Sequence, residues 1–183
     1  MNSQQVNDVI VKCKANDRQA QYELYQQYSK AMYNVSLRIL NDNMLAEDVL
    51  QMAFVKVFKN IHLYKNEATI GAWIKRIVIN TSLSELNKKK VSYQEIEDHD
   101  FVDTIEDETS YRIEDLAAVR EAIMSLPEGY RVIFSMYAIE RYDHQEISEV
   151  LGISLGTSKS QYSRAKSKIK ELLRTQNRIS NIS

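Results

Sequence analysis

The chain of 183 residues contains only one cysteine, one proline and four glycines. A lone cysteine, Cys13, excludes an internal disulfide, and no secretion signal opens the sequence, so we expect a cytoplasmic protein. No apolar run approaches the ~20 residues that cross a bilayer, which predicts a protein that is not integral to a membrane. From Met1 to Leu126 the only helix breaker is Gly71, and this scarcity predicts an all-α protein.

The patterns of a catalytic or metal site are missing as well. The three histidines, His62, His99 and His144, lie in unrelated segments of the sequence. There is no glycine-rich phosphate loop and no paired spacing of metal ligands. We therefore expect a protein that is not an enzyme, with no catalytic residues, no metal, no cofactor and no small-molecule substrate.

Charge is distributed unevenly, although the formal net charge is only −1. Residues 91–118 carry ten acidic side chains against one basic side chain, whereas residues 1–90 and 119–183 each carry more basic than acidic ones. The stretch 91–110 lacks Lys and Arg and has no sustained apolar period, so it is predicted to be an acidic flexible linker. The prediction is two small helical domains, 1–90 and 111–183, joined by this linker.

Apolar residues in the first domain recur every three or four positions, as in amphipathic helices. The stripe from Ala20 to Ile39 predicts a helix of five turns, with Asn16 or Asp17 as its cap. Residues 41–43 (NDN) predict a break and a new cap. In the next helix, the side chains expected to face the core are Leu45, Val49, Met52, Ala53, Phe58 and Ile61. A polar loop at 62–71 and a helix from Trp73, with Trp73, Ile77, Leu83 and Leu86 as core candidates, complete the domain.

The second domain ends in the pattern of a helix-turn-helix, a unit that places its second helix in the major groove of DNA. Asp143 is the predicted cap of a short helix that ends at Leu151 and faces inward with Ile147, Val150 and Leu151. Gly152 falls where the chain needs a positive φ, and Ser154 is the predicted cap of the second helix. The inward face of that helix is predicted to be Ser158, Tyr162, Ala165, Ile169 and Leu172.

The opposite face of the second helix is basic and polar. Lys and Arg side chains neutralise phosphates, and Gln and Arg pair with base edges. Gly156, without a Cβ, permits close approach to the DNA backbone. Ser148 and Ser158 stand where such units usually carry a small apolar and an aliphatic residue, and we expect both to be buried with their hydroxyls bonded back to the helix. On spacing alone, a basic helix that is merely solvated on one side remains the alternative.

Three segments resemble a known family. Residues 126–173 are similar to the promoter-reading C-terminal domain of bacterial RNA polymerase sigma factors. Residues 46–61 (AEDVLQMAFVKVFKNI) and 73–80 (WIKRIVIN) resemble the sigma N-terminal domain. Both domains in this order, with none between them, are typical of the small extracytoplasmic-function (ECF) group, and the resemblance covers roughly residues 20–173.

The resemblance implies three partners: core RNA polymerase, promoter DNA and an anti-sigma factor. It assigns core polymerase binding to Glu47, Asp48 and Gln51. It assigns recognition of the minus-ten element, including capture of an unstacked base, to Tyr64, Lys65, Asn66, Lys75, Arg76 and Asn80. It assigns recognition of the minus-thirty-five element to Thr157, Lys159, Ser160, Gln161, Arg164 and Lys168.

Several alternatives stay open on the sequence. Tyr64 either stacks on a base or only closes its loop onto the helices, while Trp73 is expected in the core. The acidic linker is either a tether or an imitation of nucleic acid inside the polymerase. A stand-alone helix-turn-helix regulator is the alternative function, and a helical adaptor without a role at DNA is a third.

Overall fold

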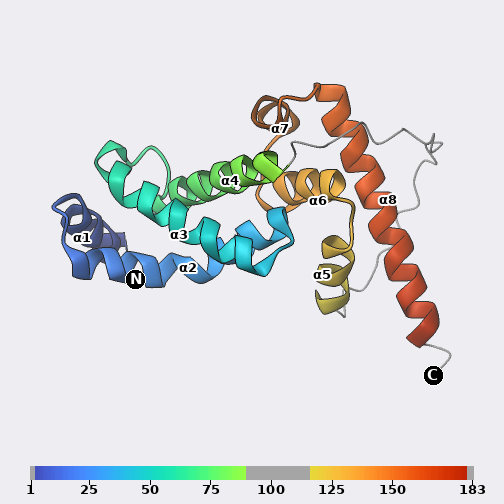
Figure 1. Ribbon diagram of the computed structural model, residues 1–183, viewed down its shortest axis with the longest axis horizontal. Coiled ribbons are helices and arrows are strands. Elements are labelled where there is room, and N and C mark those ends of the chain that lie inside the picture. Colours follow the sequence, from blue (N-terminus) through green and yellow to red (C-terminus); the bar gives the residue numbers. More distant parts are fainter. Residues whose placement is uncertain (1–2, 90–115, 181–183) are drawn as a thin grey trace. The chain divides into compact units, whose positions relative to one another are not determined.

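The computed structural model of the protein describes residues 3–89 and 116–180, and both stretches consist of helices joined by short turns (Figure 1). The chain divides into two compact units, one within residues 1–91 and the other within 92–183. The acidic segment 91–110 lies outside the described residues. No strand occurs in the described parts of the chain, so the all-α prediction is confirmed there.

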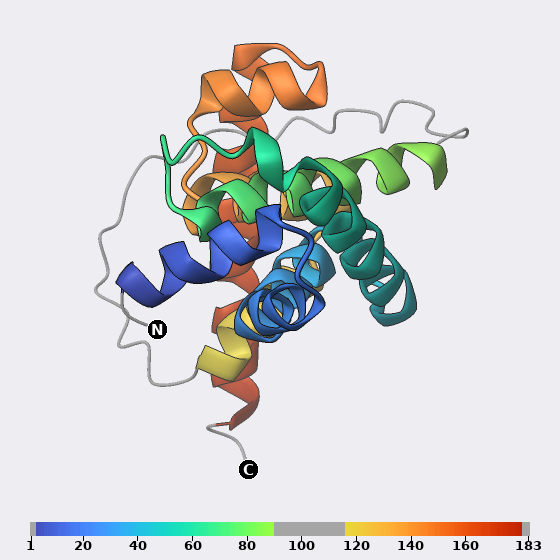
Figure 2. The same ribbon diagram turned by 90° about the vertical axis from the view of Figure 1, so that its left-hand side faces the viewer.

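The first unit is built from four helices and one short 3-10 turn. Helices α1, α2, α3 and α4 span Ser3–Lys14, Arg18–Leu40, Asn43–Asn60 and Ile70–Lys89, and the 3-10 turn spans Ile61–Leu63. Helices α2, α3 and α4 pack against one another, and α1 packs against α2 (Figures 1 and 2). Three mutually packed helices enclose one apolar core, as expected for a small helical unit.

The predicted helix boundaries around α2 are confirmed by side-chain caps. The Asp17 carboxylate accepts a hydrogen bond from the Ala20 amide and so begins α2. Asn41 ends α2 in the left-handed conformation, with φ of 52°. Asp42 then begins α3 by accepting a hydrogen bond from the amide of Leu45. Two consecutive residues therefore stop one helix and start the next, because short polar side chains satisfy the free backbone groups at helix ends.

The inward face of α3 differs from the prediction at one position. Met52 was expected in the core, but it is 37% exposed, and α3 instead buries Leu50, Phe54 and Val57 beside the predicted Val49 and Ala53. The stripe that actually packs against α2 and α4 is rotated away from Met52. Met52 is thus available on the surface.

Helix α4 also differs from the prediction, because it begins at Ile70, one turn before Trp73. Its fully buried positions include Ile74 and Val78, whereas Trp73 and Ile77 are only half-buried. The core assignment of Trp73 is therefore only partly right. The ring lies at the edge of the core rather than within it.

The second unit packs three short helices against one long one. Helix α5 spans Leu116–Met124, α6 spans Glu128–Phe134 and continues into a π-helical turn, Ser135–Ile139, and α7 spans His144–Leu151. The long helix α8, Leu155–Ser180, contacts α5, α6 and α7 (Figure 1). The core between α5 and α8 is formed by Ala122, Ile123, Leu126, Ala165 and Ile169. Across the described ranges, no helix is long and apolar enough to span a membrane.

Candidate functional site

The outer face of α3 combines acidic, amide and apolar side chains. Glu47, Asp48 and Gln51 are exposed, as predicted. Beside them, Met44 is 80% exposed and Val55 is 53% exposed, although both are apolar. Exposed apolar groups next to carboxylates suit a protein partner and not a phosphate backbone.

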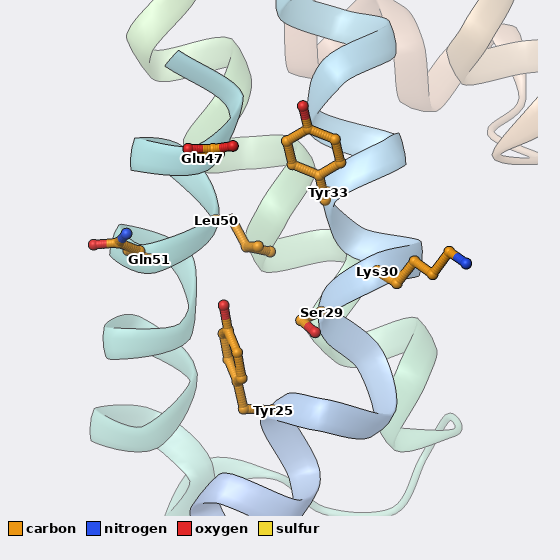
Figure 3. Close-up of a pocket in the computed structure, with 7 residues that line it drawn as sticks. All are labelled: Tyr25, Ser29, Lys30, Tyr33, Glu47, Leu50 and Gln51. Atoms are coloured by element: carbon orange, nitrogen blue, oxygen red, sulfur yellow. The ribbon is translucent and has the colours of Figure 1, made fainter. Parts of the chain in front are cut away.

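A hollow of about 520 Å³ lies between α2 and this face of α3 (Figure 3). The Tyr25 and Tyr33 side chains stand on either side of it, while Glu47 and Gln51 border it from α3. Lys30 of α2 and Glu47 of α3 are the two charged residues that line the hollow, and the amino end of Lys30 points away from its centre. The hollow can therefore accept a side chain that has an apolar stem and a positive end.

Both tyrosines are held in place by their neighbours. The ring of Tyr25 contacts the ring of Phe54 edge to face, with 4.8 Å between centroids. The hydroxyl of Tyr33 donates a hydrogen bond of 3.1 Å to Oδ1 of Asn43. The part of this site on α2 was not predicted. The signal for it was present, because residues 25, 29 and 33 follow helical spacing beside the core stripe.

Tyr64 closes the loop before α4. Its side chain is 6% exposed, and its hydroxyl donates a 2.6 Å hydrogen bond to the carbonyl of Ala68. Lys14 of α1 donates to the Tyr64 carbonyl, and the ring centroid lies 5.5 Å from that of Trp73. Burial, followed by the neighbouring Tyr28, raises the pKa of Tyr64 above its ordinary value. Of the two readings of Tyr64, the structure favours loop closure, because a buried ring offers no free face to a base.

The remaining predicted minus-ten residues lie on the loop and on α4. Lys65 and Asn66 are exposed in the loop, where Asn66 adopts a left-handed φ of 60°. Arg76 and Asn80 are exposed one turn apart on α4, and Lys75 beside them is half-buried. The structure thus places cations and amides at two positions, the loop and one helical face.

Gly71 lets the beginning of α4 approach α2. A Cβ added at Gly71 would lie 2.9 Å from Cε1 of Tyr28, closer than a carbon contact allows. The glycine therefore sets how near α4 lies to α2.

The helix-turn-helix has the predicted geometry. Asp143 and Glu146 form a reciprocal capping box at the start of α7, and Gly152 ends it with φ of 66° and ψ of 32°. Ser154 accepts a hydrogen bond from the Thr157 amide and so begins α8. A Cβ added at Gly156 would meet only Ser154 Oγ, at an ordinary 3.7 Å. Nothing within the described fold demands glycine at 156, and a role in close approach to DNA stays a prediction.

The exposed face of α8 holds the predicted minus-thirty-five residues in unequal environments. Lys159 and Ser160 are exposed, while Thr157, Gln161 and Arg164 are half-buried. Gln161 lies against the start of α6, since its Oε1 would be 3.2 Å from a Cβ added at Gly129. Lys168 is paired with the Glu171 carboxylate at 2.8 Å on the same helix. The positions freest to reach DNA are therefore in the first two turns of α8.

The packing of the helix-turn-helix departs from the prediction at two positions. Val150 was expected to face inward, but it is 39% exposed. Ser148 bonds back to the carbonyl of Gln145, as predicted. Ser158 does not: its hydroxyl lies 2.9 Å from Nδ1 of His144 on α7. This contact of His144 was not predicted.

Two family models match the chain in the order of its two units. The sigma-70 region 2 model matches residues 24–91, and the sigma-70 region 4 model matches residues 116–169. The chain is 30% identical over 151 residues to the RNA polymerase sigma factor SigZ of Bacillus subtilis, and the match covers 82% of this chain and 85% of SigZ. The chain belongs to the sigma-70 family of RNA polymerase sigma factors. It is a promoter-directing sigma factor of the ECF group, as the sequence resemblance predicted.

Further relatives agree with this membership. The sigma factor is 25% identical over 179 residues to the ECF RNA polymerase sigma factor SigW of Bacillus subtilis, covering 90% of this chain and 95% of SigW. Its fold is similar to that of the sigma factor RpoE in a co-crystal structure with the anti-sigma factor NepR from Bartonella quintana. There the TM-score is 0.54 at 20% identity, over 84% of this chain and 96% of RpoE.

Proposed function

We propose that this sigma factor docks on core RNA polymerase through α3, reads the minus-ten element with the loop and α4, and reads the minus-thirty-five element with α8. The observation that carries the proposal is the joint presence of regions 2 and 4 in order, each with an exposed polar face on one helix. A stand-alone regulator needs no region 2, so the family membership disfavours that alternative.

The surface of this chain that we propose to bind core polymerase is the outer face of α3 together with the hollow beside it. Glu47 and Asp48 are negatively charged and exposed, so they favour a basic partner and repel DNA. Met44 and Val55 supply exposed apolar area, which carries affinity in protein interfaces. We propose that a basic helical surface of core polymerase covers this face, and that a cationic side chain from it enters the hollow between Tyr25 and Tyr33.

The minus-ten surface is formed by Lys65, Asn66, Lys75, Arg76 and Asn80. Single-stranded DNA is held by cations along its backbone and by polar groups at base edges. Asn80 offers both a donor and an acceptor to a flipped base, and Arg76, one turn before it, is placed for a phosphate. Tyr64 supports this surface from within, by closing the loop that carries Lys65 and Asn66.

The minus-thirty-five surface is centred on Lys159 and Ser160, with Thr157, Gln161 and Arg164 at its borders. The first turns of a recognition helix enter the major groove, and these residues lie there. Lys168 stands further along α8 and is paired with Glu171, so its contribution is smaller. Lysine contacts to phosphates position the helix, and Ser160, Gln161 and Arg164 are the candidates for base edges.

The mechanism is that of a binding protein that acts in the cytoplasm, without catalysis or cofactor. Binding to core polymerase sets the spacing of the two DNA surfaces, and capture of an unstacked base helps to open the duplex. We also propose an anti-sigma partner. This proposal is supported by the fold similarity to RpoE, which was solved with the anti-sigma factor NepR, and to CnrH, which was solved with the cytosolic domain of CnrY.

Reconstitution tests the proposal. The full chain is mixed with bacterial core polymerase and a library of genomic promoter fragments, and the start sites of the transcripts are sequenced. The expected result is initiation at sites that share two upstream sequence blocks at fixed spacing. Absence of promoter-dependent initiation above core polymerase alone would overturn it.

A further inference from the structure

A hydrogen bond joins the two helices of the helix-turn-helix across the turn. His144 is the first residue of α7, and its Nδ1 lies 2.9 Å from the hydroxyl of Ser158 in the first turns of α8. Ser158 has no exposed surface. A buried hydroxyl that loses its partner costs more than the bond itself gains, so this pair constrains both helices.

The ring of His144 is itself held by aromatic side chains. It stacks on Tyr137 with 4.2 Å between centroids and an interplanar angle of 16°. Tyr162 of α8 lies edge-on to it at 5.7 Å and contacts Tyr137 at 4.5 Å. Three elements therefore meet at the imidazole: the π-helical turn through Tyr137, α7 through His144 itself, and α8 through Ser158 and Tyr162.

The π-helical turn fits this arrangement. The amide of Glu140 donates to the carbonyl of Ser135, five residues earlier, which widens the turn by one residue. The turn includes both Met136, which is fully buried, and Tyr137, which meets the imidazole. Such widened turns occur frequently at functional sites.

Burial of the ring favours its neutral form, and the charged groups near it act in opposite directions. Burial, and then the nearby Lys159, lower the pKa of His144, while Asp143 acts in the opposite direction. Tyr137 and Tyr162 face the imidazole ring of His144. Nζ of Lys166 lies 5.1 Å from the centroid of the Tyr162 ring. A neutral imidazole bonds the Ser158 hydroxyl in either tautomer, as donor or as acceptor.

We infer that His144 is a positioning residue for promoter reading. Its hydrogen bond to Ser158 and its stacking on Tyr137 fix the rotation of α8 about its own axis, and this rotation sets the direction in which Lys159 and Ser160 point toward the DNA. Ser158 directly precedes these two residues, and a helix that turns about its axis moves all of its side chains together. The inference rests on the proposed reading of the minus-thirty-five element by α8. A residue that touches no DNA thereby acts on sequence discrimination.

The test uses the full chain bound to core polymerase and a promoter obtained from the library. It measures the ratio of initiation between the intact promoter and one with a scrambled minus-thirty-five block. We expect Ser158→Ala, which removes only the hydroxyl, and His144→Phe, which keeps a ring for stacking, each to lower this ratio about three- to tenfold. Gln145→Ala, the next residue on α7 and exposed, is the matched control and keeps the wild-type ratio.

The double variant distinguishes positioning from general loss of stability. If the two groups act as one pair, His144→Phe with Ser158→Ala lowers the ratio no further than the worse single variant. Affinity for core polymerase stays at the wild-type value in all of them. Should His144→Phe fail to fold, Ser158→Ala carries the test alone.

Two outcomes contradict different claims. Folded variants that keep the wild-type ratio overturn the positioning role and leave the proposed function intact. A wild-type protein that initiates equally from both promoters overturns the reading of the minus-thirty-five element, and the positioning role with it.

Discussion

The two units of this sigma factor differ in the kinds of side chain that each buries in its own interior. Among the described residues, the first unit buries 23 apolar side chains with 3 polar ones, and the second buries 9 apolar side chains with 5 polar ones. Two of those five, Arg131 and Glu140, carry charge. The first unit therefore buries almost only apolar side chains, whereas the unit that contains the helix-turn-helix buries a larger share of polar ones.

Buried hydroxyls form hydrogen bonds within a helix and between helices in both units. In the first unit Thr81 and Ser82 donate to the carbonyls of Ile77 and Val78, one turn back on their own helix. In the second unit Ser158 reaches across to His144 on another helix. The first unit also contains contacts between helices, because Ser82 reaches the hydroxyl of Ser36 on α2 and Lys56 of α3 donates to the hydroxyl of Thr81. Polar bonds between helices therefore occur in both units.

The largest expected effect comes from a cavity in the apolar core of the first unit. Leu24 is 1% exposed, so Leu24→Ala is expected to lower the free energy of unfolding of this unit by about 3 kcal/mol. Denaturant unfolding followed by the fluorescence of Trp73, the single tryptophan, reports on this unit. Gln27→Ala, at an exposed position of the same helix, is the control and should change little. A loss below about 1 kcal/mol would contradict apolar packing as the main source of stability.

Much of this architecture follows from the sequence because periodicity and capping are local. The caps at Asp17, Asp42 and Asp143 were predictable from short polar residues at the ends of apolar stripes. The errors concern which residues of an apolar stripe are most deeply buried: Met52 and Val150 were expected to face the core but are exposed. That choice depends on neighbouring helices, which a single sequence does not place.

The sites show the same limit. The family resemblance supplied the residues of α3, α4 and α8 by position along the chain. The hollow between Tyr25 and Tyr33 and the bond from His144 to Ser158 each join residues on two helices. Such pairs follow from tertiary packing, and spacing along one helix does not reveal them.

A smaller loss of stability is expected when either of two glycines, Gly71 or Gly152, is substituted, and the physical reason differs between them. Gly71→Ala forces a Cβ against Tyr28, and Gly152→Ala strains a left-handed residue that has open space around it. Each should cost its own unit about 1 to 2 kcal/mol. Asparagine distinguishes the two causes, because it tolerates the left-handed conformation but is larger than alanine. Gly152→Asn should therefore recover stability, and Gly71→Asn should lose more; equal behaviour of the two asparagine variants would refute this assignment.

The smallest effect is a pH dependence confined to the second unit. The pKa of His144 is lowered in the folded protein, so the unfolded chain binds this proton more readily. The stability of the second unit is therefore complete above the ordinary histidine pKa of about 6.5 and decreases as pH falls through that value. Amide exchange of α7 and α8 at about pH 7.5 and about pH 5.5 measures it. His144→Phe should remove the decrease.

The most direct test of the central claim, that the two units carry separate binding surfaces, compares two variants in one titration series of core polymerase and then promoter DNA. Asp48→Lys should weaken binding to core polymerase about tenfold or more, because it places a cation against a basic partner. The control is Glu23→Lys, the same charge change at an exposed position of α2, and it should leave this binding unchanged. Lys159→Ala should leave core affinity unchanged, weaken promoter binding and lower the salt dependence of log affinity by about 0.9. Loss of core affinity in Lys159→Ala, or full core affinity in Asp48→Lys, would contradict the account.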